Sequence, residues 1–109
     1  IKKTFYKGNN RTKIYRDYFQ SQPEILQVKI YGSRALGTFE PGSDIDFAIF
    51  TNCEKNLAGH ILADLDELPT PYLFDVTNYN SLTNENLKEH IDTHGVVFYE
   101  KYTKSNQPR

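Results

Sequence analysis

The chain has 109 residues and a formal net charge of −1, because 13 Lys and Arg nearly balance 14 Asp and Glu. This length allows one small core, so we expect a single domain over 1–109, with its core over about 28–99 and a polar tail over 101–109. The basic residues are spread along the chain rather than clustered, which argues against direct nucleic-acid binding and favours a small-molecule or protein substrate.

The cysteine content and the hydropathy of the sequence indicate where in the cell the protein is expected. Cys53 is the one cysteine, so no internal disulfide can form, which fits the reducing cytoplasm. It has no evident base partner in the sequence, so a catalytic thiol is not expected. No apolar run approaches the roughly 20 residues that span a bilayer. We therefore expect a cytoplasmic protein without a membrane partner.

Hydrophobic spacing predicts the first elements of the chain. A short helix is expected over 11–20 and a strand over 28–31, which ends at Gly32. A helical turn over 33–36 and a loop over 38–43 should follow. The helix is expected to bury four side chains: Ile14, Tyr15, Tyr18 and Phe19.

The next elements alternate in the same way. A strand over 44–51, rich in Ile and Phe, should precede an amphipathic helix over 55–68, in which leucines recur at helical spacing. A third strand is expected over 72–78.

The last helix should begin at Thr83 or Asn84 and run to His94, with Gly95 in the usual C-terminal position. A final strand is expected over 96–99. This alternation predicts an α/β (α+β) fold in which helices flank a small mixed sheet.

The stretch that says most about chemistry is Gly32-Ser33, followed ten residues later by Asp44-Ile45-Asp46. Residues two apart on a strand point to the same face, about 7 Å apart, so Asp44 and Asp46 can share a cation. Gly32 lets a ligand approach the backbone, Ser33 adds a hydroxyl donor, and the helical turn after them offers N–H groups to anionic oxygens. A phosphate cradle beside paired carboxylates indicates metal-assisted chemistry on a nucleoside triphosphate.

Three further residues are candidates for the same site. Ser43 would be a second hydroxyl donor, whereas Arg34 either touches phosphate or braces the loop through Glu40. Asp75 sits between apolar neighbours in a predicted strand, where an unpaired buried charge is costly, so it is the candidate third carboxylate. Magnesium prefers hard oxygen ligands, and two such ions about 3.5–4 Å apart can stabilise both reacting oxygens of an in-line displacement.

Other polar residues have simpler explanations. Asp64 and Asp66 lie on the polar face of the leucine-striped helix, where solvation explains them. His90 and His94 have a spacing that can bind zinc, but no third ligand or adjacent Glu base accompanies them. They are expected to be surface histidines, and His60 is an ordinary helix residue.

The set Gly32, Ser33, Asp44, Asp46 and Asp75 resembles the signature of the DNA polymerase beta-type nucleotidyltransferase superfamily, Gly-Ser-x10-Asp-x-Asp followed by a third strand Asp. The resemblance covers about 28–99. The short chain is similar to the minimal nucleotidyltransferase (MNT) group. One branch of that group serves as antitoxin to HEPN-domain ribonuclease toxins.

The resemblance implies an enzyme that transfers a nucleoside monophosphate from a triphosphate, usually ATP, onto a hydroxyl, with pyrophosphate leaving. In the antitoxin branch the acceptor is a tyrosine of the partner toxin. Asp44 and Asp46 would hold two magnesium ions, and Asp75 would complete the site of the ion that activates the acceptor oxygen. Gly32, Ser33 and Ser43 would hold the β and γ phosphates.

Two alternatives remain open at the level of sequence. One is transfer to a small molecule, such as an aminoglycoside, by a homodimer that builds its pocket across the interface. The other is a non-catalytic antitoxin that masks its partner by contact.

Overall fold

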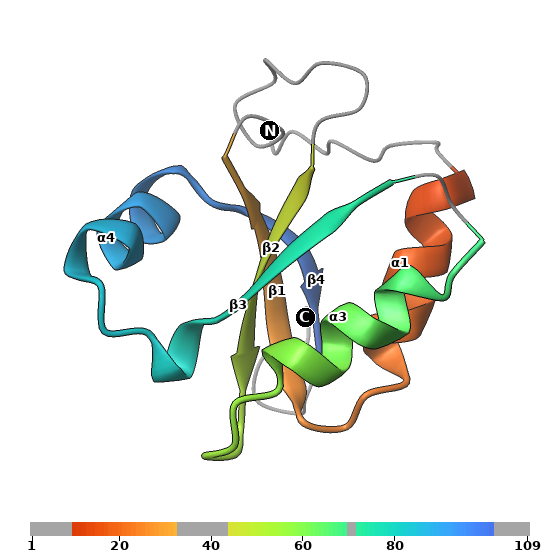
Figure 1. Cartoon of the computed structure of the whole chain (residues 1–109), viewed down its shortest axis with the longest axis horizontal. Coiled ribbons are helices and arrows are strands. Elements are labelled where there is room, and N and C mark those ends of the chain that lie inside the picture. The colour runs from red at the N-terminus through yellow and green to blue at the C-terminus, as the bar shows by residue number, and fades with distance from the viewer. Residues whose placement is uncertain (1–9, 33–43, 70–71, 102–109) are drawn as a thin grey trace, which may run out of the picture.

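The computed structural model describes residues 10–32, 44–69 and 72–101, in which a four-stranded sheet lies between helices (Figure 1). In chain order the elements are α1 (Asn10–Gln20), β1 (Ile25–Tyr31), β2 (Ile45–Thr51), α3 (Ala58–Asp66), β3 (Phe74–Asn78), the 3-10 helix η1 (Tyr79–Ser81), α4 (Glu85–His94) and β4 (Val96–Glu100). The predicted turn over 33–36, the loop over 38–43 and the tail beyond 101 lie outside the described residues.

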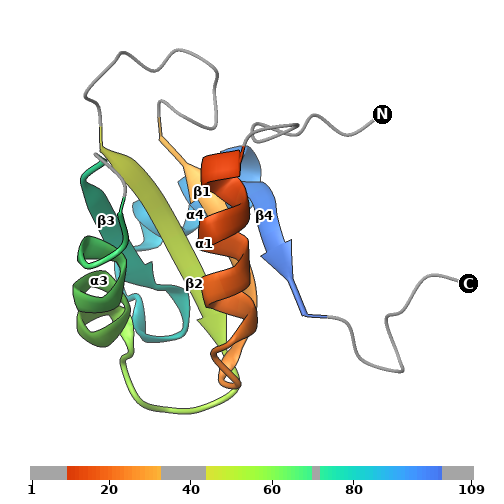
Figure 2. The same ribbon diagram turned by 90° about the vertical axis from the view of Figure 1, so that its right-hand side faces the viewer.

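The sheet has the strand order β3-β2-β1-β4 and is mixed. β1 pairs with β2 and with β4 in antiparallel fashion, whereas β2 and β3 run parallel. α1 and α3 cover one face of the sheet and α4 lies on the other, as the two perpendicular views show (Figures 1 and 2). The predicted α+β fold with a mixed sheet flanked by helices is therefore confirmed.

The main core lies between the sheet and the α1/α3 layer. Phe47 of β2 is fully buried, and its ring centroid lies 5.1 Å from that of Phe19, 5.3 Å from Phe98 and 5.9 Å from Phe74. Aromatic side chains bury large areas each, which lets a short chain build a dense core. Among the predicted α1 residues, Tyr15 and Phe19 are buried, and the other two, Ile14 and Tyr18, pack partly buried against them.

A smaller cluster lies under α4 on the opposite face. Tyr31, Ala48 and Ile91 are buried there. Because side chains alternate along a strand, Phe47 and Ile49 of β2 face the main core, while Asp46 and Ala48 face α4. Asp46, on this second face, is only partly buried.

The helix predicted over 55–68 is shorter in the structure, because side chains from outside it bind its first amides. Asn56 Oδ1 accepts a hydrogen bond from the Ala58 N–H at 2.9 Å, and Asn78 Oδ1 accepts one from the Leu57 N–H at 3.3 Å. These bonds fix the start of α3 at Ala58.

Among the described helices, none is both long and apolar enough to cross a membrane.

Gly95 ends α4 as predicted, but not through the usual left-handed conformation. Its φ is −67°, a value that any residue can adopt. A Cβ at this position would instead lie 2.5 Å from the carbonyl oxygen of Ile91 and 3.1 Å from Lys29 Cδ. Glycine is required here because the chain turns back tightly into β4.

Candidate active site

Three neighbouring strands bring the central predicted residues together. Tyr31 of β1 is the register partner of Asp46 of β2, and Asp46 is the register partner of Asp75 of β3. Register partners on adjacent strands point to the same face and lie about 5 Å apart. Asp46 and Asp75 therefore stand side by side on the face opposite the main core.

Gly32 forms a turn directly after β1, beside the two carboxylates, and this turn is called the Gly32 corner below. Gly32 follows Tyr31 and has a φ of +79°, in the left-handed region that favours glycine. A Cβ built on Gly32 would overlap Oδ2 of Asp46. The backbone at Gly32 is thus packed directly against the carboxylate, and no larger residue fits there without displacing it.

The electrostatics of the group are those of crowded carboxylates. The pKa of Asp46 is raised, first by burial, then by the negative charges of Asp75 and Asp44, while His90 acts in the opposite sense. A raised carboxyl pKa means that the ionised form lacks enough compensating positive charge. Bound cations would supply that charge, so the donor chemistry fits magnesium.

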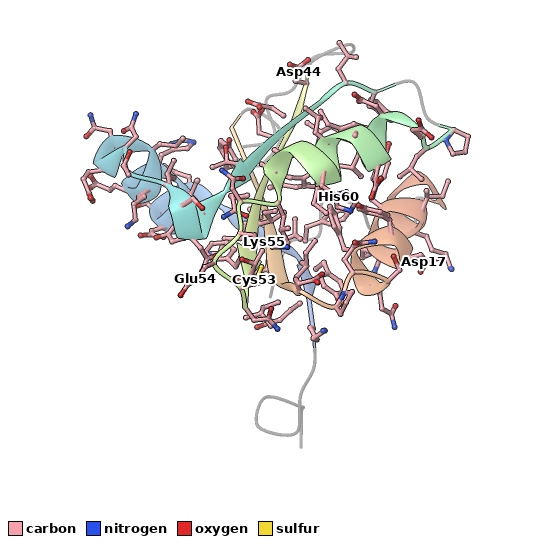
Figure 3. All side chains as sticks on the ribbon, turned by 60° about the horizontal axis from the view of Figure 1, so that its bottom comes forward. Asp17, Asp44, Cys53, Glu54, Lys55 and His60 are labelled. Carbon is pink, nitrogen blue, oxygen red and sulfur yellow. The ribbon has the colours of Figure 1, made fainter. Side chains whose placement is uncertain are left out.

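The other predicted residues are placed less closely. Asp44 lies just before β2 and is exposed, although its charge reaches Asp46. Figure 3 shows Asp44 at one end of β2, with Cys53 beyond the other end. Within the described residues, no group of three His, Cys, Asp or Glu side chains is close enough together to hold a metal ion. Ser33, Arg34 and Ser43 lie outside the described residues.

The sequence model described as "Polymerase beta, Nucleotidyltransferase" matches residues 13–104. The chain belongs to this nucleotidyltransferase family. No curated protein gives a significant match to the chain.

Solved structures share the nucleotidyltransferase fold. A toxin–antitoxin structure with AMP-PNP matches with a TM-score of 0.61 and 21% identity, over 90% of this chain and 77% of the other. The complex of a tri-AMPylated Shewanella oneidensis HEPN toxin with an MNT antitoxin gives a TM-score of 0.54 and 19% identity, over 84% and 71% of the two chains. A candidate nucleotidyltransferase from Sulfolobus solfataricus gives 0.53 and 19%, over 93% and 91%. These likenesses show a common fold.

The expected burial of Asp75 is wrong. Its apolar sequence neighbours suggested a buried carboxylate, but the side chain is exposed, because β3 is an edge strand of the described sheet. Phe74 faces the main core while Asp75 faces away from it. The residue is therefore accessible from outside beside half-buried Asp46.

Two residues beside the carboxylates could not be predicted from the sequence motif. His90, expected at the surface, is half-buried, with its ring centroid 6.0 Å from that of Tyr31. Tyr31 itself is buried at the end of β1. Its position immediately before Gly32 was the one signal available, whereas nothing local pointed to His90.

Asp64, explained above by solvation, has specific partners instead. The Tyr18 hydroxyl donates to Asp64 Oδ2 at 2.5 Å, and His60 Nε2 lies 3.3 Å from the same oxygen. The Tyr18 bond joins α1 to α3 on the face opposite the carboxylates, whereas the His60 contact lies within α3. Asp66 is exposed, as the solvation argument requires.

Proposed function

We propose that this chain transfers AMP from ATP to a hydroxyl group of a partner protein, a tyrosine of a HEPN-type toxin, and so acts as an antitoxin. The observation that carries the proposal is the convergence of Gly32, which directly follows β1, with Asp46 of β2 and Asp75 of β3. Membership of the nucleotidyltransferase family gives the reaction class. The similar folds found with AMP-PNP, and with an AMPylated HEPN toxin, suggest the nucleotide and the acceptor.

The reaction forms one bond and breaks another at the α phosphorus. The acceptor oxygen attacks that phosphorus. The bond from the α phosphorus to the oxygen that bridges the α and β phosphates breaks, and pyrophosphate leaves with the displaced electron pair. The hydroxyl proton passes to a carboxylate or to water. Magnesium, when bound, neutralises charge on the attacking and leaving oxygens.

Each residue of the chain has a distinct part in this scheme. Asp46 and Asp75, with Asp44 beside them, would hold the magnesium ions. The Gly32 corner admits the triphosphate close to the backbone, and exposed Asp75 orients the acceptor hydroxyl from the open side of the sheet. Catalysis then consists mainly of positioning the two reactants and balancing their charge.

The position of Asp75 favours a macromolecular acceptor. It lies on the edge strand β3, two residues after Leu73, which is 65% exposed. A second chain can therefore approach the carboxylates from this edge without moving any described element. This openness supports a protein tyrosine over a small acceptor that must be enclosed.

The test is incubation with α-labelled ATP, Mg²⁺ and a HEPN-type partner encoded beside this chain. The expected result is label on the partner and a mass increase of one or more AMP groups. Asp46→Asn should abolish labelling, while Asp66→Asn, on exposed α3 surface, should not. Full neutralisation of the toxin by Asp46→Asn would favour masking by contact. Label on a small acceptor without the partner would favour the small-molecule reaction.

A further inference from the structure

Tyr31 is a sheet residue that lies directly beside the candidate site. It is the last residue of β1, precedes Gly32 and pairs in register with Asp46. Its side chain is only 7% exposed. A large buried side chain thus lies directly beside the residues that the proposed function requires.

The hydroxyl of Tyr31 reaches across a whole strand. It lies 2.9 Å from Thr77 Oγ1, and either group can be the donor. Thr77 belongs to β3, which does not pair with β1, since β2 lies between them. The side chain of Tyr31 therefore bridges β2 and joins the strand that leads to Gly32 to the strand that carries Asp75.

The side chain of Tyr31 can cross β2 because the residue of β2 at the crossing is small. Ala48 is the register partner of Thr77, is fully buried, and belongs to the same cluster as Tyr31. Its methyl group leaves room for the tyrosine ring on this face. The Tyr31 ring also forms a T-shaped pair with the His90 ring of α4, at 6.0 Å between centroids.

The bridge lies close to both carboxylates. Burial raises the pKa of Tyr31, and the charges of Asp46 and Asp75 raise it further, whereas the bond to Thr77 lowers it. Tyr31 pairs in register with Asp46, and Thr77 lies two residues after Asp75 on the same face of β3, so the bond lies near both carboxylates. A shift of β3 relative to β1 would stretch the hydroxyl bond and move Asp75 away from Gly32.

We propose that Tyr31 is a positioning residue whose hydroxyl bond to Thr77 fixes β3 against β1 and so sets the separation of Asp75 from the Gly32 corner. The inference rests on the proposed function, because that separation matters only if the carboxylates share cations. Tyr31 does not itself touch the reacting atoms. It acts through the strand that carries Asp75.

The test uses Tyr31→Phe and Thr77→Val, which each remove one hydroxyl and keep the shape of the side chain. Mn²⁺ binding, followed by electron paramagnetic resonance with a non-hydrolysable ATP analogue present, should weaken by about 3- to 10-fold in either variant. The double variant should be no weaker than the single ones, because both lose the same bond. In the transfer assay kcat should fall by a similar factor while KM for ATP stays unchanged.

Tyr79→Phe is the matched control. It also removes a tyrosine hydroxyl bonded to a side chain, at 2.7 Å from Asp92 Oδ1, but this exposed bond joins η1 to α4 and does not involve β3. Mn²⁺ affinity and kcat should match those of the unaltered chain. Urea unfolding of all variants separates a loss of stability from a loss of position, and Thr77→Val serves if Tyr31→Phe does not fold.

The outcomes separate this inference from the proposed function. Unchanged Mn²⁺ affinity in both hydroxyl variants, an equal loss in Tyr79→Phe, or no Mn²⁺ binding by the unaltered chain would overturn it. If the unaltered chain binds Mn²⁺ and the variants bind it more weakly, but no partner is labelled, the positioning role stands and the proposed transfer fails.

Discussion

Gly32 and Asp46 occupy adjoining space so closely that a Cβ on the glycine would overlap the Oδ2 oxygen of the carboxylate. The glycine also has a φ of +79°. Two independent requirements, backbone conformation and contact, therefore fall on one residue. They explain in physical terms why a glycine is needed where β1 ends and the proposed phosphate cradle begins.

Gly32→Ala should therefore damage both stability and transfer. The left-handed conformation costs a non-glycine residue about 1–2 kcal/mol, and the new methyl group must also push the Asp46 carboxylate aside. We expect a loss of that size in urea unfolding and a loss of transfer greater than about tenfold, since misplaced reacting groups cost about 10²-fold.

Gly59→Ala is the control for this substitution. Gly59 lies in α3, and a Cβ there would meet nothing within 4 Å. Alanine in a helix stabilises by about 0.5–1 kcal/mol relative to glycine, so this variant should gain stability and keep full transfer. Equal transfer by Gly32→Ala and Gly59→Ala would contradict the assigned role of the Gly32 corner.

Asp46→Asn should abolish transfer and yet stabilise the free protein at neutral pH. The pKa of Asp46 is raised above its ordinary 3.8, so the folded chain binds the proton more tightly than the unfolded chain does. Its contribution to stability is therefore fully present below 3.8 and is lost as pH rises through the folded pKa. Asparagine cannot ionise and removes this loss.

Urea unfolding at pH 7 and near pH 3.5 measures the effect. The variant should be more stable than the unaltered chain at pH 7, and the difference should shrink in acid. Added Mg²⁺ should stabilise the unaltered chain but not the variant. A variant that is less stable at pH 7 would show that Asp46 is compensated by positive charge in the free protein.

Local patterns were enough to predict the faces of the strands. In Ile45-Asp46-Phe47 the apolar residues alternate with Asp46, and a strand sends neighbours to opposite faces, so Asp46 had to lie opposite the core. Apolar spacing and the residues at the helix ends predicted α1 and α4 to within a few residues. These features depend on chain neighbours alone.

Features that depend on pairing between distant segments could not be predicted from the sequence in the same way. Asp75 meets Asp46 because β2 and β3 pair in one particular register, and it is exposed because β3 is at the sheet edge. The start of α3 depends on the side chain of Asn78, from another strand. His90 reaches Tyr31 only because α4 folds back over the sheet. No local pattern encodes these contacts.

Asp75→Asn should impair transfer more than it impairs nucleotide binding. The exposed carboxylate lies on the acceptor side of the proposed site, while the Gly32 corner and Asp46 remain to hold the triphosphate. We expect kcat to fall by about 10²-fold or more, with the affinity for the non-hydrolysable ATP analogue changed by less than about threefold. Calorimetry and the labelling assay give the two values. Equal losses in both would show that Asp75 serves the nucleotide instead of the acceptor.

Tyr18→Phe tests whether the opposite face is structural. The variant loses the 2.5 Å bond from the Tyr18 hydroxyl to Asp64, which joins α1 to α3. A hydrogen bond to a charged group contributes about 1.5–3 kcal/mol, and partial exposure of this one places the expected loss near the lower value, about 1.5 kcal/mol. Urea unfolding at pH 7 measures it. Transfer at a temperature where both proteins are folded should be unchanged, because the bond lies across the sheet from Asp46 and Asp75. A loss of transfer without a loss of stability would instead give the α1/α3 face a direct part in the reaction.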